Sequence, residues 1–165
     1  MNKKQIFWCI FSWLFVAVVV AFIVYFALQD GEASTKTSTG VVDVIIDAIP
    51  NGDEITEEQK VGIHISIRQL AHFGIYFLLG FSLASALKCS FKNDNNIYIL
   101  LALALSVQFS MFDEFFMQQN TSGRGAELKD VITDSSGIVL GIFFFSLLFV
   151  LLKFISNKIK RKSLK

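Results

Sequence analysis

The sequence predicts an all-α membrane protein with four transmembrane helices. Hydrophobic residues make up 53% of its 165 positions, with 18 Phe and a single Pro. A soluble chain of this composition would expose large apolar patches. The apolar residues are concentrated in four long runs, each close to the length that crosses the hydrocarbon core of a bilayer. The length leaves room for one domain, so we expect residues 1–165 to form a single integral membrane unit.

The first apolar run covers residues 6–28 and has two interpretations. It could be a cleavable secretory signal or a retained helix. The run is longer than the roughly 7–15 apolar residues of a signal peptide, and no Ala-x-Ala-like cleavage site follows it. We therefore predict a first transmembrane helix that stays in the protein.

Residues 29–67 are polar and acidic, and we expect them to form an extracellular segment. The Gly, Ser and Thr residues of 31–40 predict a loop, and residues 41–47 predict a short amphipathic helix at the interface or against the bundle. Residues 50–53, Pro-Asn-Gly-Asp, are typical of a turn. Thr56 and Gln59 fit a capping box, which would start a helix that can continue into the second span.

Three further spans alternate with polar connections. Their predicted limits are 69–87, 97–116 and 131–152. The short polar stretch 88–96 suits an antiparallel helical hairpin, and 121–125 is Gly-containing and reads as a loop. Residues 153–165 form a basic tail.

The distribution of basic residues predicts the orientation in the membrane. Ten of the 15 Lys and Arg residues fall at one end of the predicted bundle: Lys3, Lys4, Lys88, Lys92, Lys153, Lys158, Lys160, Arg161, Lys162 and Lys165. Asp94 is the only acid on that side, whereas the other 13 acidic residues fall on the opposite side. Since cytoplasmic segments are enriched in Lys and Arg, we predict cytoplasmic termini and a plasma-membrane location.

Three residues at the start of the second span form a polar stripe. Arg68, His72 and Tyr76 are spaced by four, so they share one helix face. Each has an ordinary explanation: a snorkelling Arg, an interhelical hydrogen bond from His, and a packed or interfacial Tyr. Ionisable groups at membrane depth nonetheless favour the inside of a bundle or a wet cavity, where they find partners.

Possible partners lie near the ends of the third and fourth spans: Glu114, Gln118, Arg124, Asp130 and Asp134. Acids at a helix end can simply be solvated, and the dipole at a helix N-terminus also stabilises them. Asp134 lies deeper, where an unpaired carboxylate is costly, so we expect it to pair with a base.

A glycine pair follows on the same face of the fourth span. Gly137 and Gly141 have the Gly-xxx-Gly spacing that lets a neighbouring helix approach closely. We therefore expect the face that carries Asp130, Asp134 and both glycines to point into the bundle. The polar residues of the second, third and fourth spans would then meet in one place.

Several classes of site find no support in the sequence. The two cysteines, Cys9 and Cys89, lack CxxC spacing and fall on the predicted cytoplasmic side, so we expect neither a disulfide nor a metal site. No basic tract suggests nucleic-acid binding, and we expect no cofactor. The chain has no HExxH or GxSxG motif, so no catalytic residue can be assigned.

The polar motifs together resemble the VanZ-like membrane protein family. The matching pattern is Arg68-x-x-Ala71-His72-Phe73-x-x-Tyr76-x-x-Leu79-Gly80, Glu114-x-x-x-Gln118, Gly123-Arg124, Asp130, Gly137 and Gly141. Gln69 stands where members often carry a second basic residue, and Asp134 where they often carry Asn. The namesake is associated with low-level resistance to the glycopeptide teicoplanin, and the resemblance supplies no cofactor, metal or catalytic residue.

Three functions are compatible with these observations. The protein could bind an anionic lipid-linked or cell-wall-related ligand at the outer leaflet, with Arg68 and Arg124 as cationic contacts held by Glu114 and Asp130. It could be an intramembrane hydrolase or transferase with His72 or Glu114 as acid–base. It could also be a structural bundle braced by charge pairs. Its partners would be membrane lipids, and transport would require a homo-oligomer.

Overall fold

The computed structural model describes residues 3–48, 55–91, 96–123 and 125–163, with side chains up to residue 161. These parts of the chain are entirely helical or irregular. The helices are α1 (Lys3–Ala27), α2 (Gly31–Ala48), α3 (Glu57–Ser90), α4 (Ile97–Phe112), the π-helical turn η2 (Asp113–Gln118) and α5 (Leu128–Ser163). Four segments of this described chain are long and apolar enough to cross a membrane: α1, α3, α4 with η2, and α5. The predicted fold class and the four spans are confirmed at this level.

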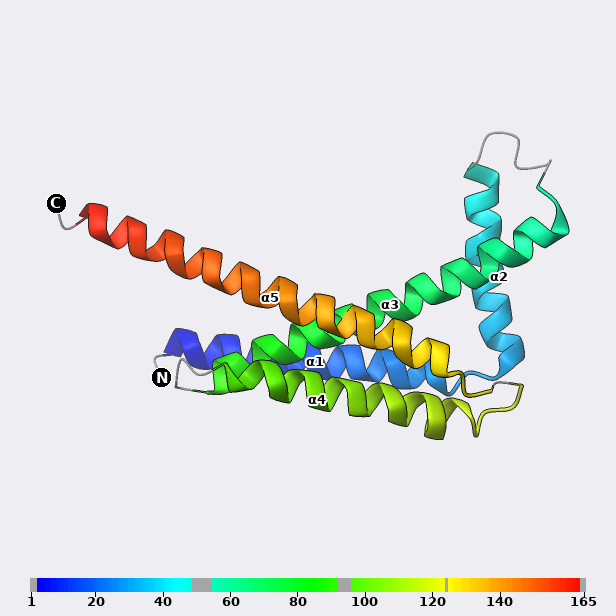
Figure 1. The fold of residues 1–165 in the computed structure, drawn as a ribbon, viewed down its shortest axis with the longest axis horizontal. Helices are drawn as coiled ribbons and strands as arrows, with labels where there is room; N and C mark the ends of the chain where they lie inside the picture. Colours follow the sequence, from blue (N-terminus) through cyan, green and yellow to red (C-terminus); the bar gives the residue numbers. More distant parts are fainter. Residues whose placement is uncertain (1–2, 49–54, 92–95, 124, 164–165) are drawn as a thin grey trace.

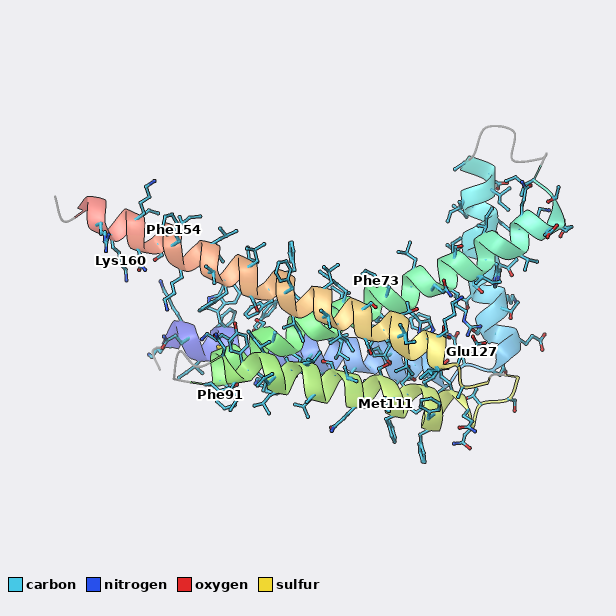
Figure 2. The ribbon with its side chains drawn as sticks, in the orientation of Figure 1. Phe73, Phe91, Met111, Glu127, Phe154 and Lys160 are labelled. Atoms are coloured by element: carbon cyan, nitrogen blue, oxygen red, sulfur yellow. A yellow bond between two sulfur atoms is a disulfide. The ribbon has the colours of Figure 1, made fainter. Side chains whose placement is uncertain are left out.

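Helix α3 is the centre of the bundle and contacts α1, α2, α4 and α5. The start of α1 and the end of α5 lie at the same end of the bundle, while α2 and the first half of α3 project from the opposite end (Figure 1). The buried apolar core includes Val19, Leu79, Ala84, Ala102 and Ile138. On the outside, Met111 and Phe154 project away from the bundle, as lipid-facing side chains would (Figure 2).

The Gly-xxx-Gly pair of α5 packs directly on α3, as its spacing predicts. A Cβ atom at Gly137 would overlap the carbonyl oxygen of Phe73, and one at Gly141 would overlap that of Phe77. Only glycine allows the two backbones to lie this close. The contact fixes the register of α5 against α3, and this register positions the polar residues described below.

The prediction of a loop over residues 31–40 is wrong, because α2 is already helical from Gly31. Asp30 caps its start, with the Ala33 amide donating to Asp30 Oδ1 at 2.7 Å. Hydroxyls within the segment bond back to carbonyls one turn earlier, for example Thr35 to Gly31 and Thr37 to Ala33. Side chains that usually compete with a helix are thus satisfied inside it. The predicted turn at 50–53 lies outside the described residues.

The predicted limits of the other helices change less. The Thr56–Gln59 capping box is present, and α3 continues unbroken from Glu57 through the second span. The third span ends in η2 rather than as a regular α-helix. The basic tail expected after residue 152 continues α5 as helix up to Ser163.

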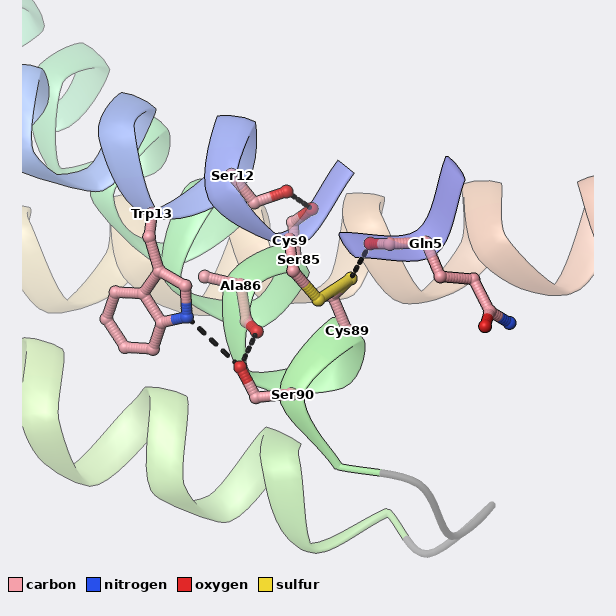
Figure 3. Close-up of a disulfide and its surroundings, with 8 residues drawn as sticks. All are labelled: Gln5, Cys9, Ser12, Trp13, Ser85, Ala86, Cys89 and Ser90. Atoms are coloured by element: carbon pink, nitrogen blue, oxygen red, sulfur yellow. Dashed lines mark hydrogen bonds between the residues drawn. A yellow bond between two sulfur atoms is a disulfide. The ribbon is translucent and has the colours of Figure 1, made fainter. Parts of the chain in front are cut away.

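The expectation that Cys9 and Cys89 do not form a disulfide is wrong. The two residues are bonded, with Cα atoms 5.4 Å apart, and the bridge joins α1 to the end of α3 (Figure 3). Trp13 Nε1 donates to Ser90 Oγ at 3.0 Å beside it. The pair is separated by 80 positions in the chain, so a search for local CxxC spacing could not find it.

Candidate functional site

Two ion pairs connect the polar stripe of α3 to the first turns of α5. Arg68 Nη2 lies 3.1 Å from Asp130 Oδ2, and His72 Nδ1 lies 3.2 Å from Asp134 Oδ1. The residues are four apart on both helices and the numbering rises in the same direction on each, so the pairs form two successive rungs between parallel helices. The carboxylate of Asp134 is fully buried, at 0% exposure, and it finds the partner that its depth requires.

A second set of hydrogen bonds brings in the third span. Tyr76 Oη donates to Asp113 Oδ2 at 2.7 Å, and Gln118 Nε2 donates to the same oxygen at 3.1 Å. Ser110 Oγ donates to Asp134 Oδ2 at 2.9 Å. The network therefore links α3, the end of α4, η2 and α5 in one place.

The π-helical turn explains how Asp113 and Gln118 reach each other. A π-helix brings residues five apart into alignment, whereas a regular α-helix aligns residues three or four apart. Asp113 and Gln118 are five apart and both lie on the buried face of η2. Single π-helical turns are frequent at functional sites.

Among the described residues, Glu114 bonds to a backbone amide rather than to Arg68. Its Oε1 atom accepts the backbone N–H of Glu127 at 2.8 Å, so it fastens the connection that leads into α5. Asp130, rather than Glu114, pairs with Arg68 among the described residues. Arg124, the other predicted cation, lies outside them.

A cavity of about 250 Å³ lies against this network. Its apolar wall comes from α1, α2 and α3, with Ile23, Phe26, Val41 and Ile75 among its residues. Its polar residues include Arg68, His72, Tyr76, Asp113 and Gln118. Four of the eight predicted ligand-binding or charge-network residues, Arg68, His72, Tyr76 and Gln118, thus border a single space.

Some buried oxygens of η2 have no hydrogen-bond partner among the described residues. They are Asp113 Oδ1, Glu114 Oε2 and Gln118 Oε1. All three residues are nearly inaccessible, with exposures of 2%, 0% and 1%. Buried acceptors are normally satisfied, so each of these atoms calls for a donor from elsewhere.

Within the described residues no group of three or more His, Cys, Asp and Glu side chains is arranged to hold a metal ion. The acids and His72 are instead engaged with one another, with Tyr76 and with Ser110. The site is therefore a hydrogen-bonded charge network beside a cavity.

Sequence reasoning missed two members of the site. Asp113 and Ser110 are not among the partners predicted for the polar stripe, yet both bond within the network. Both are polar residues at the end of an otherwise apolar run, close to Glu114, and this position could have indicated them. The cavity wall from α2 was also missed, because 31–40 was expected to be a loop.

Comparison with known proteins identifies the family. The model of the VanZ/LLP1 family matches residues 11–151, which cover part or all of each of the four spans and every residue of the network. The chain belongs to the VanZ/LLP1 family. The resemblance inferred from the polar motifs is thereby confirmed. No curated protein and no solved structure matches the chain.

Proposed function

We propose that this VanZ-family membrane protein binds an amphiphile that carries an anionic group, such as a lipid-linked cell-wall precursor, at the outer leaflet. One observation carries the proposal. The cavity has an apolar wall from α1, α2 and α3, and the guanidinium of Arg68 borders the same space. Ligand sites are commonly apolar cavities in which a few polar groups fix orientation.

Arg68 suits the anionic part of such a ligand. A guanidinium has five N–H donors, and the hydrogen bond to Asp130 Oδ2 uses one of its nitrogens. The Arg68 side chain remains 42% exposed, whereas that of Asp130 is 6% exposed. Asp130 thus holds the guanidinium in place while further donors stay accessible to phosphate or carboxylate.

Binding to lipids in nanodiscs tests the proposal. An Arg68→Gln protein should lose at least about tenfold in affinity for an anionic phospholipid, because a charge-assisted contact is worth about 1.5–3 kcal/mol. Lys129→Gln is the matched control, since Lys129 is an exposed cation in the first turn of α5, next to Asp130. Equal affinity of wild type and Arg68→Gln would contradict the proposal.

A role in glycopeptide susceptibility is the physiological part of this proposal. Deleting the protein should change teicoplanin susceptibility in the cells that carry it. Restoring the wild type, but not a correctly inserted Arg68→Gln protein, should reverse the change. If both proteins restored the same susceptibility, the ligand site would have no part in the response to the antibiotic.

A structural role is the second candidate, and the two α3–α5 rungs favour it. Charge pairs at membrane depth can orient helices without binding anything. An intramembrane enzyme receives less support. Ser110 donates to Asp134 rather than to His72, so these three residues do not form a nucleophile–base contact.

A further inference from the structure

The η2 end of the cavity differs chemically from the Arg68 end. Asp113 and Gln118 both border the cavity there. Tyr76 and Gln118 Nε2 donate to the same oxygen of Asp113, Oδ2. The other oxygen, Oδ1, and the amide oxygen of Gln118 are left as buried acceptors without a described partner.

These two oxygens require hydrogen-bond donors. An anion placed there would face a carboxylate and an amide oxygen, and would satisfy neither of them. The group that occupies this end must instead carry N–H or O–H bonds. Because the amide nitrogen of Gln118 donates to Asp113, its amide oxygen is the atom of this side chain that is left as an acceptor without a described partner.

The charge of the surroundings favours an ammonium over a hydroxyl. Four nearly inaccessible carboxylates, those of Asp113, Glu114, Asp130 and Asp134, share the described network with one guanidinium and one imidazole. Buried charges are stabilised when opposite charges accompany them. A primary ammonium supplies both a positive charge and three N–H donors.

We propose that the η2 end of the cavity, formed by Asp113 and Gln118, binds a primary ammonium group of the amphiphile. The inference rests on the proposed function and deepens it. The ligand then carries an amine as well as the anionic group that contacts Arg68, and its apolar part lies along Ile23, Val41 and Ile75. Two oxygens accept from the ammonium, and the Asp113 carboxylate neutralises it.

A series of phospholipid head groups distinguishes the effect of N–H donors in the ligand from the effect of its positive charge. Phosphatidylethanolamine has a primary ammonium, phosphatidylcholine has a quaternary ammonium without N–H bonds, and phosphatidylglycerol has hydroxyls and no ammonium. Binding of each is measured by native mass spectrometry of protein released from nanodiscs that contain the three lipids in equal amounts. We expect phosphatidylethanolamine to be retained about tenfold more than phosphatidylcholine.

Two variants locate the preference at η2. Asp113→Asn removes the negative charge and keeps an acceptor, and Gln118→Met removes the free acceptor at similar size. Each should reduce the preference for phosphatidylethanolamine over phosphatidylcholine to about threefold or less. Gln119→Met is the control, since Gln119 is exposed next to Gln118 and its replacement should leave the preference unchanged. Thermal unfolding of each purified protein checks that the variants are folded.

The outcomes separate the inference from the proposed function. Retention of all three lipids without an amine preference, or a preference that Asp113→Asn and Gln118→Met leave intact, overturns the inference only. A preference for phosphatidylglycerol that both variants abolish shows that hydroxyls occupy this end, and likewise overturns it. Retention of no lipid above the level of the surrounding bilayer overturns the proposed function as well.

Discussion

The central helix α3 is joined to its neighbours by different kinds of contact at the two ends of the bundle. At the end where α1 begins, α3 is joined to α1 by the Cys9–Cys89 bridge and by the Trp13–Ser90 hydrogen bond. Lys88 also lies at this end, with its Nζ 4.9 Å from the ring centroid of Tyr98. At the opposite end, α3 is joined to α4, η2 and α5 by buried carboxylates with Arg, His, Tyr and Ser partners.

The difference indicates where the chain has a role beyond holding its helices together. A disulfide and small or aromatic side chains are sufficient to fix helices in a membrane. Carboxylates at membrane depth are costly and need partners around them. These carboxylates are concentrated beside a cavity, and η2 carries buried acceptors without a described partner, so that end is the candidate site.

The largest stability effect is expected at Asp134. Asp134→Ala leaves His72 and Ser110 without their acceptor in a fully buried position, and should destabilise the protein by about 3 kcal/mol. Asp134→Asn, which retains an acceptor, should cost less. Unfolding in mixed micelles with increasing SDS measures both. A stable Asp134→Ala protein would show that the buried network does not hold the helices.

The glycine contact provides the next test. Gly141→Val places a branched side chain against the Phe77 backbone and should cost about 2–3 kcal/mol by overpacking. Gly40→Val is a useful contrast, because a Cβ there meets nothing within 4 Å. The same SDS titration reports both changes. Similar stability of the two variants would contradict the close packing of α3 on α5.

A charge swap sharpens the distinction between bracing and binding. Arg68→Asp and Asp130→Arg should each cost about 1–2 kcal/mol, less than at Asp134 because Arg68 is half exposed. The double variant restores the pair with reversed polarity. We expect it to recover stability without recovering binding of the anionic lipid. If the double variant recovered both stability and lipid binding, Arg68 would act by pairing with Asp130 and not by contacting the lipid, which favours the structural role.

The spacing of polar residues on regular helices could be predicted from the sequence. Arg68, His72 and Tyr76 on α3, and Asp130, Asp134, Gly137 and Gly141 on α5, follow the helical repeat, and the structure places each set on one face. Helical periodicity and the cost of burying charge were sufficient for this.

The features that were missed depend on contacts between distant residues or on irregular backbone. The π-helical turn that aligns Asp113 with Gln118 has no sequence signature of its own. The disulfide depends on α1 and α3 packing side by side. Helix α2 forms from residues typical of loops because Asp30 caps it and because Ser38 hydrogen-bonds to His64 of α3 at 3.0 Å.

The last and smallest effect is the reactivity of Cys9 and Cys89 toward a thiol reagent, which also bears on the orientation of the protein. The excess of basic residues predicts that this end faces the cytoplasm, where thiols are kept reduced, whereas disulfides persist in oxidising compartments. The purified protein should react with maleimide only after reduction. In intact cells, free thiols would agree with cytoplasmic termini. A bridge already formed in cells, together with an external C-terminal reporter, would reverse the predicted orientation.

Photo-crosslinking from inside the cavity tests the central claim most directly. A photoreactive amino acid at Ile75, which borders the cavity, is compared with one at Leu78, which is 42% exposed on the outside of α3. Mass spectrometry then identifies the lipids attached at each position in native membranes. We predict a restricted set of amphiphiles at position 75 and the bulk lipid mixture at position 78. The same mixture at both positions would contradict a ligand-binding cavity.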